Sequence, residues 1–375
     1  MNHISFVIPG LDRIGGAESQ MILLAKGLSQ RGWRVSVVAL SGEGGNEATK
    51  LLASGITFVS LEMLKGLADP RGWVRFNRWL RQQTPDVVHA HLPHAAWMAR
   101  WSRLAAPSRV VIDTLHSSST GTRGRKFGYQ ISNWLTDQVT AVSHAVADAH
   151  HAVHMATDIV VIPNGIDTET WRPDVAVRES LRHGLSLEDK FLWFAAGRLD
   201  PVKDYPTLLA AMAQLPKCSQ LVVAGSGPLE PQLHQLSRDL AIESRVRFIG
   251  FEPDVKRWMR AADAFVLSSQ WEGLPIALLE AAACGLPAVA TDVPGTRDAV
   301  VDGETGLLVP KADAKALAAA MDHVMQSTPI DRRTMGERAR QRVVNCFSLE
   351  SVLNHWEALY TDLLQRNRKP SRRAS

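Results

Sequence analysis

One local pattern repeats along the whole chain: a short run of β-branched and other apolar residues, followed by a longer stretch of helical character. Such runs lie at 4–8, 35–40, 56–61, 86–91, 110–116, 139–143 and 159–162. The pattern starts again after residues 163–167, with runs at 191–196, 221–224, 246–249, 264–267, 288–291 and 306–309. Continuous apolar strands that alternate with helices are typical of a parallel sheet covered on both faces. The pattern therefore predicts an α/β fold with two doubly wound Rossmann-like domains.

The length supports this division, because 375 residues exceed what one hydrophobic core usually covers. We expect an N-terminal domain over residues 1–167 and a C-terminal domain over 168–345, facing each other across a cleft. The sequence from Gln341 to Leu364 predicts a final helix. Residues 366–375, with five basic residues and a proline, predict a disordered basic tail.

The composition is that of a soluble globular protein, with 45% hydrophobic and 21% charged residues. Its three cysteines have neither metal-site spacing nor an even number for a disulfide framework, which favours reduced thiols and a cytoplasmic location. No apolar stretch approaches the length of about 20 residues that a spanning helix needs. Any membrane contact is therefore expected to be peripheral.

The net charge of +4 hides an asymmetry between the two halves. Residues 1–165 contain 16 Lys and Arg against 11 Asp and Glu, whereas residues 166–365 contain 21 against 27. A basic first half suggests an anionic partner there, such as an acceptor or an anionic membrane surface. No nucleic-acid partner is expected.

Two cations follow the first strand of the second half. Gly197 and Arg198 directly follow the run 191–196, and Lys203 comes five residues later. A pyrophosphate needs fixed positive charge near backbone donors, with Arg supplying a planar fork and Lys a point charge. An isolated loop of this kind is more often an ordinary solvated connection, so the interpretation depends on the acidic segment described next.

Glu272 and Glu280 flank the start of a short helix. Pro275 suits its first position, and the amides of Gly273 and Leu274 would lie beside the Glu272 carboxylate, where hydroxyls and a phosphate-bearing ligand could bind. Glu280 falls among leucines and alanines, and a carboxylate in such surroundings needs hydrogen-bond donors. A sugar or a ribose diol would supply them.

Glycines after strands give weaker signals. Gly225 and Gly227 lack the third glycine and the distant acid of a nicotinamide-binding fingerprint, so no such cofactor is expected. Gly15 and Gly16 precede a helix that we expect to start near Ala17. They allow a phosphate or sugar to approach closely, and a plain tight turn explains them equally well.

The histidines do not predict a metal site. His116 should emerge at the end of its strand, where it could donate or accept a hydrogen bond near a reacting sugar or serve a structural role. His89, His91 and His94 cluster in sequence, but no carboxylate is near and scattered histidines at strand ends are common. We therefore predict no bound metal.

Two basic aromatic stretches could meet a membrane surface. Residues 70–82 carry four arginines among tryptophan and phenylalanine residues, and we favour a crossover helix that covers the sheet. The stretch from Arg123 to Tyr129 is read as a loop beside His116, and it could equally be only solvated.

The motifs together resemble the retaining family 4 glycosyltransferases (glycosyl transferases group 1) with the GT-B architecture. The resemblance covers nearly the whole chain, and the most specific match is the pair of glutamates with seven residues between them. The other matching segments are 15–18, 85–91, 142–143, 163–167, 197–198, 203 and 225–228. In this fold a final helix crosses back to the first domain, which is the role implied for residues 346–365.

The resemblance also implies roles for individual residues. Arg198 and Lys203 would hold the donor diphosphate and stabilise the leaving group, and Glu280 would hold the ribose hydroxyls. The sugar hydroxyls would bind Glu272 and the amides of Gly273 and Leu274. Other positions implied near the donor are His116 beside the sugar, Gly15 and Gly16 near the phosphates, Gly197 and Gly225 in the phosphate loops, and Phe251 beside the base.

The implied activity is metal-independent, retaining transfer of a hexose from a nucleotide sugar, with UDP favoured as the nucleotide. The acceptor would be a lipid-linked or growing cell-surface polysaccharide, such as a lipopolysaccharide precursor of the cell envelope, with the protein peripheral on the inner face of the cytoplasmic membrane. Two alternatives stay open: a nucleotide-sugar epimerase of the same fold, and a catalytically silent sugar-nucleotide-binding subunit. No cofactor beyond the nucleotide-sugar substrate is expected.

Overall fold

The computed structural model describes residues 1–12, 14–64, 69–156 and 158–367. The chain divides into two compact units: unit 1 contains residues 1–165 and the C-terminal segment from Leu349, and unit 2 contains Ile166–Ser348. The sequence predicts boundaries after 167 and 345, close to these positions. Most of the basic tail predicted over 366–375 lies outside the described residues.

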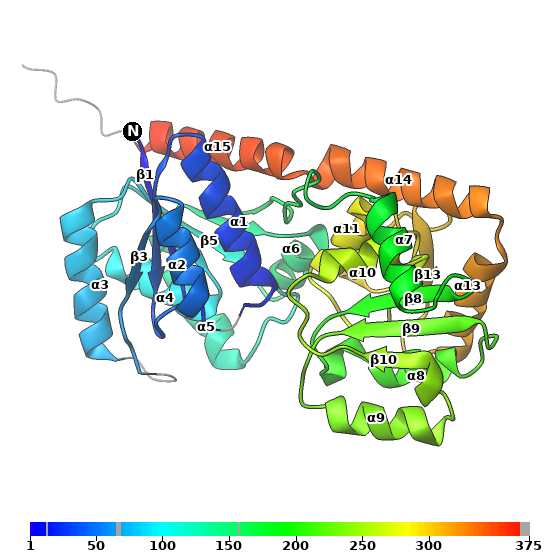
Figure 1. Ribbon diagram of the computed structural model, residues 1–375. Coiled ribbons are helices and arrows are strands. Elements are labelled where there is room, and N and C mark those ends of the chain that lie inside the picture. Colours follow the sequence, from blue (N-terminus) through cyan, green and yellow to red (C-terminus); the bar gives the residue numbers. More distant parts are fainter. Residues whose placement is uncertain (13, 65–68, 157, 368–375) are drawn as a thin grey trace, which may run out of the picture. The chain divides into compact units, whose positions relative to one another are not determined.

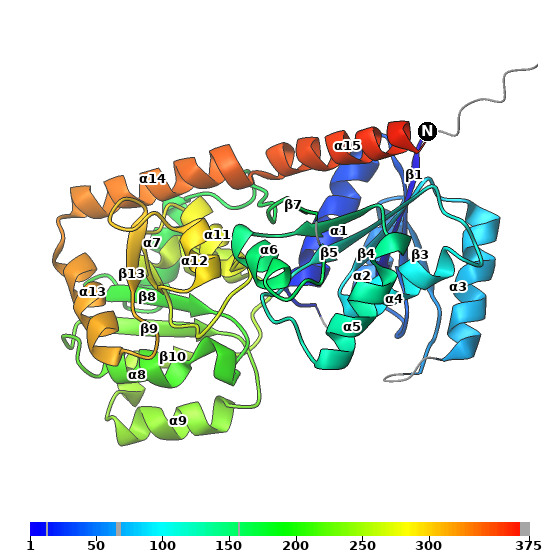
Figure 2. The ribbon, with the colours of Figure 1, turned by 180° about the vertical axis from the view of Figure 1, so that it is seen from behind.

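Unit 1 is built on a parallel sheet, which has seven strands in the described part of the chain, in the order β3-β2-β1-β4-β5-β6-β7. Its strands are β1 (His3–Ile8), β2 (Arg34–Ala39), β3 (Thr57–Ser60), β4 (Val87–His91), β5 (Val110–Leu115), β6 (Gln138–Ala141) and β7 (Ile159–Val161). Its helices are α1 (Gly16–Gln30), α2 (Gly45–Ala53), α3 (Pro70–Gln83), α4 (Pro93–Ser102), α5 (Arg123–Ser132), the 3-10 turn η1 (Asn133–Leu135), α6 (His144–His151) and α15 (Leu349–Arg366). Helices α1 and α2 lie on one face of the sheet (Figure 1), and α4 and α5 on the other (Figure 2).

The last helix completes the core of unit 1. Trp356 and Tyr360 of α15 are buried in the same apolar cluster as the side chains of β1, β2 and α1. The Tyr360 hydroxyl lies 2.8 Å from Nδ1 of His89, and the rings of His89 and Trp356 are 4.6 Å apart. Residues separated by more than 250 positions therefore share one core.

Unit 2 contains a second parallel sheet, six-stranded over Ile166–Ser348, in the order β10-β9-β8-β11-β12-β13. Its strands are β8 (Phe191–Ala196), β9 (Ser219–Ala224), β10 (Val246–Phe248), β11 (Ala264–Leu267), β12 (Ala288–Thr291) and β13 (Gly306–Val309). Its helices are α7 (Val175–Gly184), η2 (Pro201–Lys203), α8 (Tyr205–Met212), α9 (Glu230–Asp239), η3 (Glu243–Arg245), α10 (Val255–Ala261), α11 (Ile276–Ala283), α12 (Pro294–Ala299), α13 (Ala314–Gln326) and α14 (Pro329–Phe347). Both predicted doubly wound domains are therefore confirmed.

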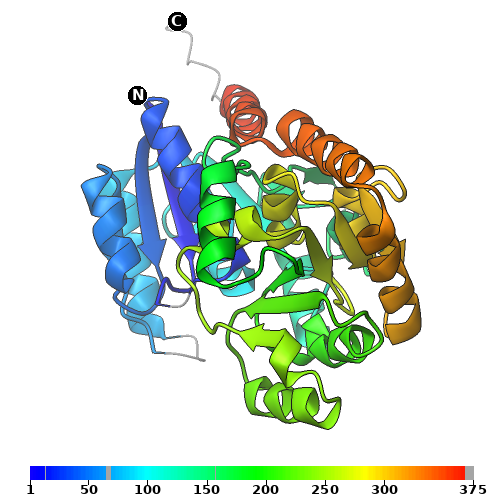
Figure 3. The same cartoon turned by 45° about the vertical axis from the view of Figure 1, so that its right-hand side comes forward.

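The predicted single helix from Gln341 to Leu364 is wrong. The structure has two helices there, α14 and α15, which Figure 3 shows in orange and red with a break between them. Ser348 adopts an extended conformation (φ −61°, ψ 143°) and forms a strand-like bridge with Ile166, whose amide donates to the carbonyl of Phe347 at 2.7 Å. Pairing with another segment replaces the helical hydrogen bonds at this residue.

Two local predictions need correction. The stretch from Arg123 to Tyr129 is not a loop but the start of α5, because the Thr122 side chain caps the first amides of a helix. Pro275 is the residue before α11 rather than its first residue.

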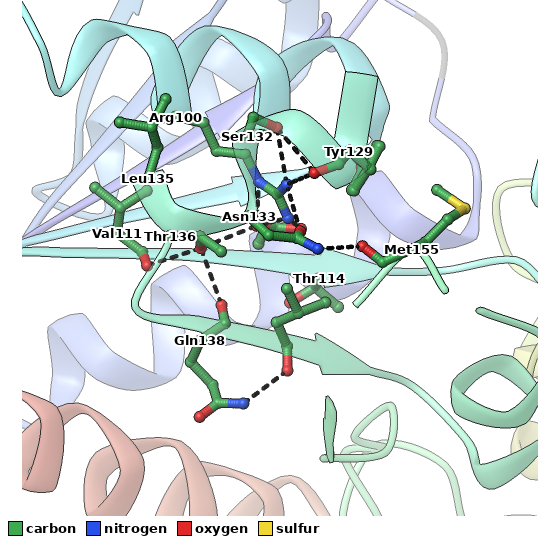
Figure 4. A network of polar contacts seen from close by, with 12 residues as sticks. Arg100, Val111, Thr114, Tyr129, Ser132, Asn133, Leu135, Thr136, Gln138 and Met155 are labelled. Carbon is green, nitrogen blue, oxygen red and sulfur yellow. Dashed lines mark hydrogen bonds and ion pairs between the residues drawn. The ribbon is translucent and has the colours of Figure 1, made fainter. Parts of the chain in front are cut away.

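A buried ion pair joins the helices of unit 1 to its sheet. The Arg100 guanidinium on α4 donates to both Asp113 carboxylate oxygens on β5, at 2.9 and 3.0 Å. It also donates to Ser132 and Asn133, and it lies over the Tyr129 ring (Figure 4). Every nitrogen of this fully buried guanidinium thus donates a hydrogen bond, which offsets its desolvation.

No helix among the described residues combines the length and the apolar character needed to cross a bilayer.

Candidate active site

Two loops at the carboxyl ends of neighbouring strands β8 and β11 are joined by hydrogen bonds in unit 2. The Gln270 amide donates to the carbonyl of Val202 at 2.7 Å, and the Ser268 hydroxyl donates to the carbonyl of Lys203 at 2.8 Å. The Gln270 side-chain amide also donates to Asp204. In doubly wound sheets ligands bind at these strand ends. The cation-bearing loop (residues 197–204) and the acidic loop (residues 268–275), both predicted from the sequence, are therefore parts of one site.

The Lys203 ammonium and the Glu272 carboxylate form an ion pair. Lys203 Nζ lies 2.6 Å from Glu272 Oε1, and the Ser269 hydroxyl donates to the same oxygen at 2.6 Å. The two side chains are only 21% and 11% exposed, so the pair is poorly screened by water. The arrangement fixes the ammonium group in position before any ligand binds.

Arg198 is the exposed cation of the same loop. Its side chain is 70% exposed, and the nearest carboxylate among the described residues is Asp200, at 3.8 Å from Nε. A separation of 3.8 Å is too long for a hydrogen bond. The guanidinium therefore retains its donors for a ligand such as a phosphate.

Glycines allow the neighbouring loops to pack closely. A Cβ atom on Gly225 would lie 2.0 Å from the carbonyl oxygen of Gly197, and one on Gly227 would lie 2.3 Å from that of Leu199. Gly225 also has a positive φ of 138°. Any side chain at Gly225 would push the loop after β9 away from the cation-bearing loop.

Phe251 lies near this pair of loops, because the preceding residue, Gly250, is hydrogen-bonded to Gly225. The Gly225 amide donates to the carbonyl of Gly250 at 2.7 Å, and Phe251 follows with a 78% exposed side chain. A large exposed aromatic ring at a strand-end loop is available for stacking.

Glu280 carries the most perturbed carboxyl group of the site. It lies on α11, and no hydrogen bond or ion pair to its carboxylate is found among residues 1–12, 14–64, 69–156 and 158–367. Burial raises its pKa to about 8, because the surrounding apolar side chains disfavour the charged form. An unsatisfied acid of this kind would gain free energy from a ligand that donates hydroxyl hydrogen bonds.

His116 lies in unit 1, immediately after β5. Its Nε2 is 2.9 Å from Nδ1 of His91 at the end of the adjacent strand β4. Burial lowers the pKa of His116 to about 4, and it lowers the pKa of His91 well below 6.5. Both imidazoles are therefore neutral at pH 7, and one can donate a hydrogen bond to the other.

The remaining histidines have separate surroundings. His89 bonds Tyr360 and Thr114 within the core, and His94 is exposed on α4. Across the described ranges, no group of three or more His, Cys, Asp or Glu residues is arranged to hold a metal ion.

Gly15 and Gly16 form the start of α1. The Gly15 amide donates to the Glu18 carboxylate at 3.0 Å, which occupies that donor within the capping box. Gly16 is the first helical residue. The sequence did not indicate this internal use of the Gly15 amide.

The structure thus groups the site residues by unit. Unit 2 brings together the cations Arg198 and Lys203, the acid Glu272 and the glycines Gly197 and Gly225, with Gly273 and Leu274 in the same acidic loop, Glu280 on the helix that follows it and Phe251 on a neighbouring loop. Unit 1 holds His116, Gly15 and Gly16. Sequence reasoning missed His91 as the partner of His116, although its place at the end of a predicted strand was a usable signal.

The fold and the site define a two-domain Rossmann-like α/β protein with charged strand-end loops suited to a phosphate-bearing ligand. Two family models match the chain: "Glycosyltransferase Family 4" over residues 14–170 and "Glycosyl transferases group 1" over residues 177–342. Together they cover most of its length. The chain belongs to the family 4 glycosyltransferases and has their GT-B fold.

Individual relatives are more distant. The chain is 28% identical over 298 residues to N-acetyl-alpha-D-glucosaminyl L-malate synthase of Bacillus anthracis, covering 76% of this chain and 77% of the relative. It is 25% identical over 315 residues to UDP-Gal:alpha-D-GlcNAc-diphosphoundecaprenol alpha-1,3-galactosyltransferase of Escherichia coli, covering 80% and 81%. The crystal structure of Anabaena Alr3699/HepE in complex with UDP-glucose matches with a TM-score of 0.84 at 22% identity, over 96% of this chain and 99% of the other.

Proposed function

We propose that this glycosyltransferase moves a hexose, with retention of configuration, from a UDP-sugar to a lipid-linked or growing cell-surface polysaccharide acceptor. The name of the E. coli relative contains both a UDP-sugar donor and a lipid diphosphate acceptor, and the HepE complex contains UDP-glucose. The name of the B. anthracis relative contains malate instead. The excess of Lys and Arg over residues 1–165 of this chain supports an anionic acceptor.

The observation that carries the proposal is the joined pair of loops that holds Lys203 against Glu272 and leaves Arg198 exposed. Departure of a nucleoside diphosphate places negative charge on its β-phosphate, and preorganised cations stabilise such charge as it develops. In this proposal, Arg198 and Lys203 bind the diphosphate and stabilise the transition state.

The acids have binding roles in this scheme. Glu280 accepts hydrogen bonds from the ribose hydroxyls, which would satisfy its otherwise unpaired carboxylate. Glu272, already held by Lys203 and Ser269, accepts hydrogen bonds from the hydroxyls of the transferred sugar, which binds beside Gly273 and Leu274. The neutral imidazole of His116 acts as a hydrogen-bonding group beside the donor sugar.

Retention is proposed to occur by front-face attack, in which the leaving phosphate takes the proton of the acceptor hydroxyl. Glu272 is engaged with an ammonium group, which lowers its value as a nucleophile, and neither glutamate is given that role. The two cations are proposed to replace a divalent metal, so activity should persist in EDTA. The reaction is proposed to take place on the cytoplasmic face of the membrane.

Alanine substitutions of the two cations test this function. Arg198→Ala and Lys203→Ala should each reduce kcat by about 100-fold or more, the scale of losing one transition-state donor. Arg238→Ala is the matched control, because that arginine is exposed on α9 and bonds only Gln235 among the described residues. Unchanged turnover in either cation variant would remove the proposed leaving-group role.

Product analysis separates the remaining alternatives. NMR of the product should show the anomeric configuration of the donor. Incubation with UDP-sugar alone should leave the sugar unchanged, whereas an epimerised sugar would identify an epimerase.

A further inference from the structure

Unit 1 contains a cavity of about 960 Å³ at the carboxyl edge of its sheet. Its lining includes Gly10, Ser41 and Pro93, which follow β1, β2 and β4 respectively. The turn from His91 to His94 connects it to the site of His116, because His91 bonds His116 and His94 lines the cavity. Its volume is at the upper end of the range for small-molecule sites, about 300–1,000 Å³.

The walls of the cavity are mainly aromatic and aliphatic. Trp73 of α3, Trp97 and Trp101 of α4 and Tyr129 of α5 contribute to them, and the rings of Trp97 and Trp101 meet edge to face at 6.2 Å. A cavity with such walls gains from a ligand with an apolar body, because binding removes apolar surface from water.

The cavity lining contains two carboxylates, of Asp12 and Asp69, and one guanidinium, of Arg125. Asp69 and Asp12 are both engaged: the Asp69 carboxylate accepts from the Arg71 amide at 2.9 Å and Asp12 accepts from the Gly44 amide at 3.0 Å. The exposed Arg125 guanidinium makes no side-chain hydrogen bond or ion pair with any described residue. It is the guanidinium of the lining, and its donors remain available to an anionic ligand.

A flat bilayer surface fits this region less well. Helix α3 has exposed arginines, but Phe76, Trp79 and Leu80 on its apolar face are buried in unit 1. That face cannot enter a membrane without opening the core. The exposed rings of Trp73 and Trp97 line a concave cavity, which suits a single chain.

We propose that this cavity binds the apolar chain of a lipid-phosphate acceptor, with Arg125 holding its phosphate and the glycan directed toward His116. The inference rests on the proposed function, because the lipid is the carrier of the acceptor sugar. It adds the place where the carrier binds and the residues that recognise it.

Binding of farnesyl phosphate to the full-length protein, measured by calorimetry below its micelle concentration, tests the inference. Trp97→Ala should weaken binding by about tenfold or more, as expected for an aromatic anchor. Trp134→Ala is the matched control: Trp134 is a more exposed tryptophan of unit 1 that does not line the cavity. Equal losses in both variants would overturn the proposal.

The Arg125→Gln variant tests the contribution of the phosphate to binding separately from that of the apolar chain. This variant should bind farnesyl phosphate about tenfold more weakly and farnesol unchanged, whereas Arg78→Gln, an exposed arginine on α3 outside the lining, should match the wild type with both ligands. A different result would overturn the proposal: Arg125→Gln loses binding to both inorganic diphosphate and farnesyl phosphate, and farnesol binds to no form of the protein. That result would show a phosphate site without a site for the chain.

UDP titration in parallel distinguishes this inference from the proposed function. If UDP binds and sugar transfer occurs while farnesyl phosphate does not bind, the cavity proposal fails alone. If UDP does not bind, the transferase proposal fails. Sedimentation with phosphatidylglycerol vesicles that depends on Arg78 and not on Trp97 would assign the region to a membrane surface instead.

Discussion

The two units differ in the electrostatic character of the groups at their strand ends. The site in unit 2 holds an ammonium paired with a carboxylate and an exposed guanidinium, beside an acid whose pKa is raised by burial. The strand ends of unit 1 present neutral imidazoles and an aromatic cavity. Under the proposed function, this difference assigns charge stabilisation for the departing diphosphate to one unit and recognition of a less polar group to the other.

The largest effect is expected at the buried ion pair of unit 1, because this pair is charged whereas the strand ends of that unit present neutral groups. Arg100→Met leaves the Asp113 carboxylate buried and unpaired, which should destabilise unit 1 by about 3–5 kcal/mol. Arg366→Met, which breaks the exposed pair with Asp362 on α15, should cost no more than about 1 kcal/mol. Thermal unfolding compares them, and equal shifts would contradict the assigned importance of burial.

The next effect concerns the packing of loops in unit 2. Gly225→Ala places a Cβ atom 2.0 Å from the Gly197 carbonyl oxygen, so the cation-bearing loop must move. Overpacking costs about 1–3 kcal/mol, and it should weaken UDP binding by about tenfold or more. Calorimetry measures this affinity. Gly184→Ala, whose added Cβ meets nothing within 4 Å, should bind UDP normally. UDP binding as tight in Gly225→Ala as in this control would show that the close approach does not matter.

A smaller, pH-dependent effect is expected at Glu280. Its pKa of about 8 means that the free protein carries this acid mostly protonated at pH 7, and ribose hydroxyls that donate to the carboxylate favour proton release. UDP affinity should therefore rise with pH and level off above about pH 8. The Glu280→Gln variant and a 2′,3′-dideoxy analogue of UDP should both lack this rise, and a rise that persists in either would contradict the ribose assignment.

The smallest effect is acid destabilisation through His116. Its folded pKa of about 4 lies below the unfolded value of 6.5, so the unfolded chain binds the extra proton first. Stability from this residue is complete above about pH 6.5 and decreases as the pH falls toward 4. Denaturant unfolding of His116→Gln should show a weaker acid dependence than the wild type, while substitution of the exposed His144 should not change the dependence.

The sequence predicted the parallel sheets well, because buried strands such as those ending at Ala196 and Thr291 are continuous apolar runs with glycine or polar residues after them. It also predicted which loops carry charge. The ion pair of Lys203 with Glu272 was beyond reach, since it depends on β8 and β11 being neighbours in the sheet. Local periodicity contains no information on strand order.

The features of unit 1 that the sequence did not predict also depend on contacts between distant segments. The partner of Arg100 lies on a different element, and the walls of the aromatic cavity come from segments that are distant in sequence. The break at Ser348 also depends on a remote segment, because Ile166 supplies the bridging partner. Helical propensity alone predicts continuation through that residue.

The return of α15 to unit 1 has a consequence for synthesis on the ribosome. Residues 1–165 emerge first, yet Trp356 and Tyr360, which pack against their sheet, emerge last. The second half of the chain is contiguous and can close its core while the first half still waits for its final helix. Nascent chains halted before Leu349 should therefore leave the first half open to proteolysis and the second half protected.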